Sequence, residues 1–331
     1  MNNKIERGQF FTKRNIFKLT PFKNWWNLIP EKYKDNILEP FAGSNNIINL
    51  LKEINLISKY KSFDIEPKEE TVIQRDTFID FPKGFNCVIT NPPYLSKNSA
   101  SKKKINIKFN NYNDLYEIAL SKCLENSKYV AAIIPESFIT TNKLKERVYA
   151  IISLTYNDMF DDTEHPVCLA LFVPEKTKDY EIYKNEDYLG TISKIKDKKN
   201  DLLKRNTKLN IKVKFNMKDG KIHLLAVDNN TNDKGILFSI DNLVKKEEIK
   251  VSSRARTRIK IIVEDKEIID KNILNLIQLK ANEILKEYRK ETADTLLTSF
   301  KGLRKDGYYR RRLDFDTAKK ILIKSVELIL N

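Results

Sequence analysis

Residues 87–94 read CVITNPPY, an apolar run followed at once by a segment with two prolines. The run predicts a buried strand. The prolines predict a rigid, extended segment after it, because each fixes its own φ and restricts the residue before it. The Asn91 side-chain oxygen and the Pro92 carbonyl are therefore expected to be fixed hydrogen-bond acceptors, with the Tyr94 ring beside them as a stacking surface. Such a group is suited to gripping a planar amino group.

Predicted strands and helices alternate on both sides of this stretch. Apolar runs predict strands, and apolar residues at helical spacing predict helices. The expected strands are 36–39, 60–63, 86–90, 129–134 and 167–172, and the expected helices are 45–56, 113–126 and 143–150. The alternation favours a mainly parallel α/β sheet with helices on both faces, and such sheets carry their active sites at the carboxyl ends of the strands. Glu39, Asp64 and Asn91 fall at or just beyond strand ends and are expected to meet in one cleft.

The pattern changes after Pro174, which predicts a second domain. Two apolar runs, 211–215 and 221–226, flank a turn sequence at 217–220 and predict a hairpin. Further strands are expected at 236–240 and 259–263, and helices at 267–288 and 317–330. We therefore expect a domain of residues 1–175 followed by an α+β domain of residues 176–331.

The sequence Asn91-Pro92-Pro93-Tyr94 resembles motif IV of the amino-methyltransferases that use S-adenosylmethionine (AdoMet). Over residues 8–172 the chain resembles the γ group of N6-adenine DNA methyltransferases, and beyond them the resemblance is one of architecture. It implies a Rossmann-like AdoMet-dependent methyltransferase sheet, followed by a DNA-recognition domain. The implied activity is site-specific methylation of adenine N6 in duplex DNA, as in restriction-modification systems.

Three further segments resemble cofactor motifs of this group. Residues 39–44, EPFAGS, resemble the AdoMet loop, in which Asn45 stands where a second glycine is usual; asparagine tolerates the left-handed conformation. Residues 8–12 resemble the N-terminal cofactor motif, with Lys13 in place of the usual proline. Residues 75–78, RDTF, resemble motif III, which implies that Asp76 contacts the amino group of the cofactor's adenine. Asp64, 21 residues after Gly43, is spaced for a ribose contact. The expected cofactor residues are Phe10, Phe11, Thr12, Glu39, Pro40, Ala42, Gly43, Asp64, Ile65, Asp76, Thr77 and Asn91.

The resemblance also implies a mechanism for the tetrapeptide. Asn91 and Pro92 would accept the two N–H groups of the target amine, with Pro93 and Tyr94 completing the catalytic motif. Because the amino group is unreachable inside a duplex, the adenine would flip out and stack on Tyr94. His165 is a candidate for the opposite face of the base, and an ordinary loop histidine is the alternative.

Basic charge is concentrated in the second half of the chain. Residues 176–331 hold 37 Lys+Arg against 24 Asp+Glu, whereas residues 1–175 hold 24 against 21. This asymmetry predicts a DNA-binding surface, with a generally lysine-rich proteome as the alternative. The candidate DNA-binding residues are Lys102, Lys103, Lys104, Arg254, Arg256, Arg258, Arg304, Arg310, Arg311 and Arg312. The segment 97–108, which follows the tetrapeptide, is interpreted either as a solvated loop or as a mobile phosphate-contacting loop.

Composition narrows the remaining choices. The hydrophobic fraction of 41% suffices for ordinary cores, and no apolar stretch predicts a membrane span or a signal peptide. Three separated cysteines and two histidines predict neither disulfides nor a metal site, so we expect a cytoplasmic protein. Abundant Lys, Asn and Ile with scarce Gly fit an AT-rich bacterial or phage gene. A companion restriction endonuclease is a candidate partner. The alternative activities are RNA amino-methylation, N4-cytosine methylation and methylation of a protein glutamine.

Overall fold

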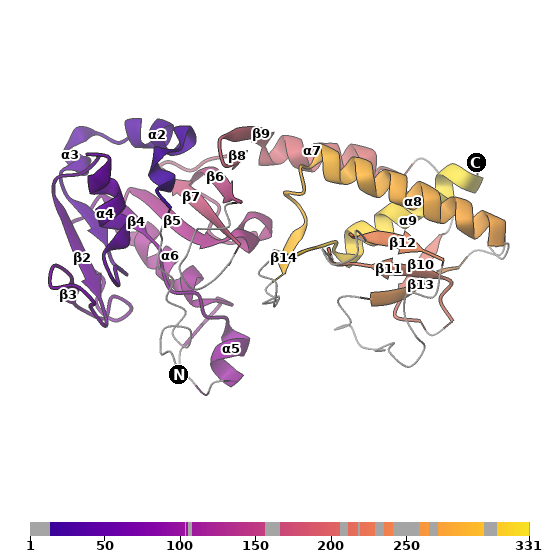
Figure 1. Cartoon of the computed structure of the whole chain (residues 1–331), viewed down its shortest axis with the longest axis horizontal. Helices are drawn as coiled ribbons and strands as arrows, with labels where there is room; N and C mark the ends of the chain where they lie inside the picture. The colour runs from indigo at the N-terminus through magenta and orange to yellow at the C-terminus, as the bar shows by residue number, and fades with distance from the viewer. Residues whose placement is uncertain are drawn as a thin grey trace. The chain divides into compact units, whose positions relative to one another are not determined.

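The chain folds into two compact units, Met1–Ile192 and Ser193–Asn331 (Figure 1). The computed structural model describes residues 14–102, 104, 108–155, 166–205, 211–217, 219–228, 235–240, 258–264, 271–300 and 310–330. The boundary between the units lies after residue 192 and not after residue 175, because two strands that follow Pro174 still belong to the first sheet. These are β8 (Glu181–Lys184) and β9 (Asp187–Thr191).

The first unit is built on one nine-stranded sheet of order β3-β2-β1-β4-β5-β7-β6-β8-β9. Its other strands are β1 (Ile37–Glu39), β2 (Tyr60–Asp64), β3 (Ile73–Gln74), β4 (Cys87–Thr90), β5 (Tyr129–Pro135), β6 (Val148–Leu154) and β7 (Val167–Phe172). Strands β3, β2, β1, β4 and β5 pair in parallel, and β7 runs antiparallel between β5 and β6. The α/β class and the expected Rossmann-like methyltransferase sheet are confirmed.

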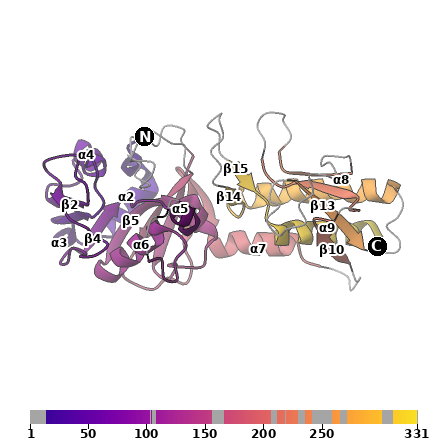
Figure 2. The same ribbon diagram turned by 90° about the horizontal axis from the view of Figure 1, so that it is seen from below.

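Helices flank this sheet (Figure 2). They are η1 (Ile16–Lys18), α2 (Thr20–Asn27), α3 (Glu31–Lys34), α4 (Asn46–Glu53), α5 (Lys97–Lys102), α6 (Leu115–Asn126) and η2 (Glu136–Thr140). Helix α2 has a proline, Pro21, in its first turn, where proline is favourable. It buries Phe22, Trp25 and Trp26, and the Trp25 indole N–H donates to the Phe172 carbonyl at the end of β7 (3.0 Å).

The helix expected at 143–150 is wrong, because most of that segment is a turn that leads into strand β6. Leu144 has a left-handed φ of 57°, which interrupts any helix there. The apolar run 150–152 is fully buried and pairs with β7 on one side and β8 on the other. Burial on both faces removes the alternation that would identify a strand in the sequence.

The second unit packs helices on a four-stranded sheet of order β10-β13-β11-β12. The strands of the second unit are β10 (Lys212–Phe215), β11 (Ile222–Leu225), β12 (Leu237–Ser239), β13 (Arg258–Glu264) and, in a separate two-stranded sheet, β14 (Thr298–Phe300) and β15 (Arg310–Arg312). Its helices are α7 (Ile192–Leu202), α8 (Lys271–Glu291) and α9 (Phe315–Leu330). Helices α8 and α9 lie side by side along the sheet in both views. Leu224, Phe238, Ile277 and Ile321 belong to their shared core.

The expected hairpin between β10 and β11 is wrong, although a turn does form between them. The Gly220 N–H donates to the Met217 carbonyl (3.1 Å), as a tight turn requires. The two strands nevertheless pair with β13, which lies between them. The turn sequence therefore indicated where the chain reverses direction. The strand that pairs with both β10 and β11, however, comes from a distant part of the chain.

Two other expectations from composition concern the cysteines and membrane-spanning segments. Cys87, Cys123 and Cys168 are buried and free in the first unit, and burial raises the pKa of each thiol far above its ordinary value. Within the described ranges, no helix has the length and apolarity that crossing a membrane would require.

Candidate active site

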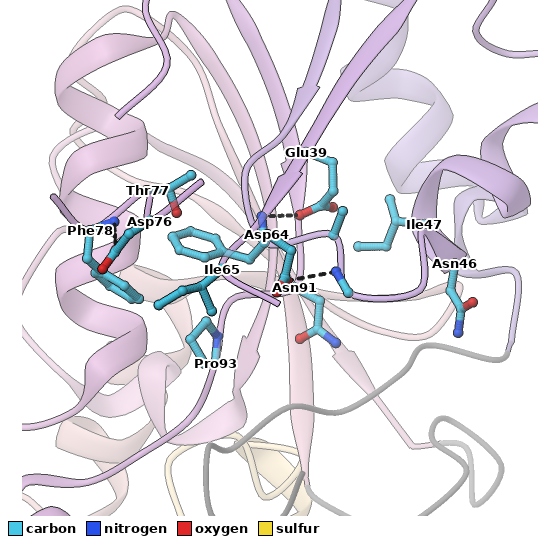
Figure 3. A pocket seen from close by; sticks show the side chains of 13 residues that line it. Glu39, Asn46, Ile47, Asp64, Ile65, Asp76, Thr77, Phe78, Asn91 and Pro93 are labelled. Carbon is cyan, nitrogen blue, oxygen red and sulfur yellow. Dashed lines mark hydrogen bonds between the residues drawn. The ribbon is translucent and has the colours of Figure 1, made fainter. Parts of the chain in front are cut away.

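A solvent-open pocket of about 640 Å³ lies where β1, β2 and β4 end (Figure 3). Nine residues expected from the sequence line it: Glu39, Ala42, Gly43, Asp64, Ile65, Asp76, Thr77, Asn91 and Pro93. Four further lining residues were not expected: Phe41, Asn46, Ile47 and Phe78. The expected meeting of Glu39, Asp64 and Asn91 is confirmed.

The loop between β1 and α4 forms one wall of the pocket. Gly43 and Asn45 both have left-handed φ values, 52° and 58°, so the expected conformation of Asn45 is confirmed. Its side chain is buried, accepts from the Ser62 hydroxyl (2.7 Å) and donates to the Thr71 hydroxyl (3.2 Å). Asparagine thus replaces glycine at no cost in backbone geometry and ties the loop to the segment after β2.

Asp64 also holds this loop in place. One carboxylate oxygen accepts from the Gly43 N–H and the other from the Glu66 N–H, each at 2.8 Å. The side chain is buried at the edge of the pocket, and Figure 3 shows it centrally among the lining residues. Carboxylate oxygens have lone pairs beyond these two bonds, so Asp64 keeps acceptor capacity toward a ligand.

Glu39 is a buried carboxyl group with one oxygen engaged. Its Oε1 accepts from the Thr90 hydroxyl (2.6 Å) and the Phe41 N–H (3.1 Å). Its Oε2 is buried and has no hydrogen-bond partner in the described part of the chain, and the residue is 1% exposed. Burial raises the pKa of Glu39 to about 8, against the smaller lowering by those two hydrogen bonds.

The opposite wall comes from the segment 76–78. Asp76 accepts from the Phe78 N–H (2.9 Å), and the buried Thr77 hydroxyl donates to the Pro40 carbonyl (3.0 Å). Pro40, which was expected at the cofactor, is buried and is not among the residues that line the pocket. The rings of Phe41 and Phe78 are 5.1 Å apart at their centres. The two rings are tilted by 41° to each other and make this wall apolar. In the sequence, each of these aromatic residues stands beside a motif, and nothing else indicated the wall.

The tetrapeptide lies beside Asp64 at the end of β4. Asn91 and Pro93 line the pocket, and Pro92 is buried behind them. The expectation of an exposed Tyr94 ring needs correction. Tyr94 is buried, its hydroxyl is bonded to the Asn91 Oδ1 and the Ile133 carbonyl (2.7 Å to the latter), and its ring packs edge-on against Tyr116. In this structure its hydroxyl supports Asn91, and its ring is not open to a ligand.

The lysine-rich segment after the tetrapeptide is partly helical. Leu95, Ala100, Phe109 and Leu115 form a small core that anchors α5, and the buried Asp114 accepts from the Leu95 N–H (2.9 Å). Lys102 and Lys104 are exposed beside this core. The segment therefore presents its lysines from an anchored element and is not a wholly irregular loop.

The remaining predicted residues fall into two groups. Phe10, Phe11, Thr12, Lys103, His165, Arg254, Arg256 and Arg304 lie outside the described residues, and only the backbones of Arg258 and Arg310 are described. Arg311 and Arg312 are partly buried in β15. Arg311 pairs with Asp294 (3.2 Å), which also pairs with Arg289 (2.8 Å). Arg311 therefore stabilises the second unit, and the structure does not present it as a free DNA contact.

Part of this chain is similar to a known protein family. Residues 6–162 match the family model described as Eco57I restriction-modification methylase, a little under half of the chain. A search of curated proteins gave no match.

Three solved structures illustrate the structural likeness. The type I restriction-modification methyltransferase subunit from Streptococcus thermophilus shares 16% identity over 53% of this chain and 47% of that chain, with a TM-score of 0.39. The type IIL enzyme MmeI, in complex with DNA, shares 12% over 56% and 40%, with a TM-score of 0.39. The EcoKI M protein shares 14% over 46% and 45%, with a TM-score of 0.34.

Each of these three matches spans less than half of the other chain, and its TM-score is below 0.5. The similarity to these proteins therefore adds no argument to the sheet order and the family match. The family match covers the part of the first unit that carries the pocket.

Proposed function

We propose that this protein is a DNA methyltransferase that transfers a methyl group from AdoMet to the N6 amino group of adenine. The observation that carries the proposal is that Asn91 lines the same pocket as Gly43, Asp64 and Asp76. A residue suited to gripping an amino group thus lies beside residues suited to holding a nucleoside. The family match of residues 6–162 to restriction-modification methylases supports DNA as the substrate class.

The pocket residues fit AdoMet better than a phosphorylated cofactor. The described lining includes three carboxyl groups, from Glu39, Asp64 and Asp76, and no lysine, arginine or histidine. Such a lining favours a cation and disfavours a pyrophosphate. The partnerless Oε2 of Glu39 requires a donor, Asp64 is at hand for ribose hydroxyls, and Asp76 with the Phe41–Phe78 wall suits an adenine ring.

AdoMet, when bound, supplies a methyl group on a positively charged sulfur. The protein would supply acceptors for the target amine, Asn91 Oδ1 and the Pro92 carbonyl, held rigid by the two prolines. Accepting both N–H groups concentrates the amine's lone pair on its nitrogen, which makes that nitrogen a better nucleophile. The hydrogen bond from the Tyr94 hydroxyl would help to keep the Asn91 side chain in place.

Target selection is assigned to the second unit. DNA affinity would come from Arg254, Arg256 and Arg304 of the second unit, which lie outside the described ranges. Lys102 and Lys104 of the first unit would add to it. The adenine would leave the helix to reach Asn91, and flanking contacts from Tyr94 or His165 would require the Tyr94 ring to become exposed.

The test is an acceptor competition with radiolabelled AdoMet. Unmethylated bacterial DNA, tRNA, rRNA and a protein mixture are offered together, and the labelled products are digested and identified. We expect label in DNA as N6-methyladenine, and none with the Asn91→Ala variant. Label in N4-methylcytosine would change the target base, whereas label in RNA or in glutamine would refute the DNA assignment.

A further inference from the structure

Phe78 contacts two parts of the first unit at once. It lines the pocket, where its ring centre lies 5.1 Å from that of Phe41. It also packs against the α5 core, the buried cluster of Leu95, Ala100, Phe109 and Leu115. The side chain of Phe78 is only partly buried, so a molecule that fills the pocket would bury it further. The pocket wall and the support of α5 therefore share one aromatic ring.

Backbone hydrogen bonds hold the start of α5 beside the tetrapeptide. Leu95, the residue directly after the tetrapeptide, donates its N–H to the buried Asp114 carboxylate (2.9 Å). Its carbonyl accepts from the Leu115 N–H (3.0 Å), and the Lys97 N–H donates to the Asn113 carbonyl (2.9 Å). Helix α5 is thus tied to the tetrapeptide at its start, and its core rests on the pocket wall.

The segment that carries α5 has a surface suited to a polyanion. Residues 95–113 contain five lysines and no acidic residue. Four of these lysines are described, and all four are exposed: Lys97, Lys102, Lys104 and Lys108. Lysines contact DNA phosphates irrespective of the base sequence. Because Lys97 follows Tyr94 by three residues, their Cα atoms lie within about 11 Å of each other. A phosphate next to the target nucleotide is therefore the partner that this surface fits.

We propose that Phe78 is a positioning residue that couples the cofactor pocket to the DNA-contacting lysines of α5. A ligand in the pocket fixes the Phe78 ring, the ring supports the α5 core, and the core holds Lys97 and Lys102 against phosphates beside the target nucleotide. DNA bound on α5 stabilises the same position of the ring from the other side. The inference rests on the proposed use of AdoMet and DNA, and it adds an interaction between the two binding steps.

The coupling is reciprocal. If a cofactor strengthens DNA binding by some factor, DNA must strengthen cofactor binding by the same factor, and such factors are typically about 5–150. The coupling factor is a ratio of two affinities measured on one protein. A variant that is merely less stable, or that binds one ligand more weakly, leaves this ratio unchanged. Loss of coupling with both ligands still bound is therefore a result that a general structural defect does not produce.

The experiment measures both directions of the coupling on the full chain. The first probe is a fluorescently labelled short duplex of mixed sequence, which suffices because phosphate contacts do not depend on sequence. Its affinity is measured by anisotropy with and without saturating S-adenosylhomocysteine, the cofactor without its transferable methyl group, so the DNA stays unmodified. Calorimetry then gives the affinity for S-adenosylhomocysteine with and without the duplex. Thermal melting verifies that each variant is folded.

Variants of the pocket wall test the role of Phe78. Phe78→Ala removes the ring that joins the pocket to the α5 core. Phe78→Leu keeps apolar packing on that core but shortens the side chain on the pocket side, and it is the milder variant for folding. Phe41→Ala is the matched control, because Phe41 lines the same wall but is not among the described residues that pack against the α5 core.

Variants of the surface test the role of the lysines. Lys97→Gln with Lys102→Gln removes two proposed phosphate contacts at exposed positions, where the α5 core is untouched. Lys23→Gln with Lys32→Gln is the charge-matched control. These two lysines are exposed on α2 and α3, which Figure 1 shows on the far side of the first unit from α5.

For wild type we expect a coupling factor of at least about five, equal in both directions. Phe78→Ala should reduce the factor to about one while both ligands still bind, and Phe78→Leu should reduce it part of the way. Phe41→Ala should keep the wild-type factor even where it weakens cofactor binding. The variant of Lys97 and Lys102 should lose the coupling and lower the slope of log affinity against log salt by about 1.8. Its charge-matched control should keep the coupling.

A factor near one in wild type, with both ligands bound, would overturn the inference and leave the proposed function standing. An unchanged factor in either Phe78 variant, or in the variant of Lys97 and Lys102, would overturn it as well. Failure of the wild-type protein to bind S-adenosylhomocysteine or DNA at all would refute the proposed function, and the inference with it.

Discussion

The two units carry their functional chemistry in different ways. In the first unit, pocket residues sit at strand ends and are fixed by short-range bonds, such as that from the Gly43 N–H to Asp64. Its net charge is small, with 27 Lys+Arg against 25 Asp+Glu in residues 1–192. In the second unit, 34 Lys+Arg stand against 20 Asp+Glu in residues 193–331. The pocket residues thus come from local motifs, whereas the excess basic charge is distributed over the second unit.

The difference teaches that basic residues in the second unit cannot be assigned by type alone. Arg289 pairs with both Asp228 (3.1 Å) and Asp294 (2.8 Å), and Asp294 in turn binds Arg311. These arginines hold the end of α8 to the segment after β11 and to β15. An arginine that completes such a network is already engaged within the protein, whereas a residue for DNA needs its guanidinium free.

Replacing Asn91 should separate catalysis from cofactor binding most strongly. Asn91→Ala removes a proposed acceptor of the target amine, and we expect methyl transfer to fall by at least about 10²–10³-fold. AdoMet affinity should stay within severalfold, because Glu39, Asp64 and Asp76 remain. Single-turnover transfer and calorimetric binding measure both on one preparation. Transfer near the wild-type rate would remove Asn91 from the proposed mechanism.

Replacing Asp64 should have the reverse effect. Asp64→Ala removes the tether of the Gly43 loop and the proposed ribose acceptor, so AdoMet affinity should fall about 10–100-fold, which is about 1.4–3 kcal/mol. Asp35→Ala, at an exposed position of the same unit, is the charge-matched control and should bind normally. An unchanged dissociation constant for Asp64→Ala would transfer the ribose contact to another residue, with Glu66 next.

Much of the first unit could be predicted from the sequence because its information is local. A strand that ends in a motif places that motif at the sheet edge, which is why Asp64 and Asn91 were both expected in the pocket. The left-handed conformation of Asn45 could be predicted for the same reason, since a left-handed loop position favours asparagine when glycine is absent. The aromatic wall of Phe41 and Phe78 was missed because two segments that are distant in sequence form it.

What the sequence did not predict depended on long-range pairing. Strand β6 is recognisable only from its neighbours β7 and β8. Strand β13 lies between β10 and β11, so the predicted turn forms but the predicted hairpin pairing does not. The burial of Tyr94 has a similar origin, because its hydroxyl partner, the Ile133 carbonyl, belongs to β5. Neither a turn residue nor a motif residue specifies which distant group it will meet.

The role of Tyr94 is tested by removing only its hydroxyl group. Tyr94→Phe keeps a ring that can stack on a base but loses the bonds to Asn91 and Ile133, so we expect the turnover rate to fall about tenfold, with the KM for DNA little changed. Tyr94→Ala should raise KM as well if the ring also flanks the base. A fully active Tyr94→Phe variant would show that stacking is the whole contribution of this residue.

The smallest expected effect separates the two kinds of arginine in the second unit. Arg254→Gln should weaken DNA binding by a few-fold and lower the slope of log affinity against log salt by about 0.9, because one fewer counterion is released. Arg311→Gln should leave that slope unchanged and instead lower the melting temperature, because Asp294 loses one of its two partners. AdoMet affinity should be normal in both variants. A reduced salt slope for Arg311→Gln with normal melting would show that Arg311 leaves Asp294 to bind DNA, and that the contrast between the two arginines is wrong.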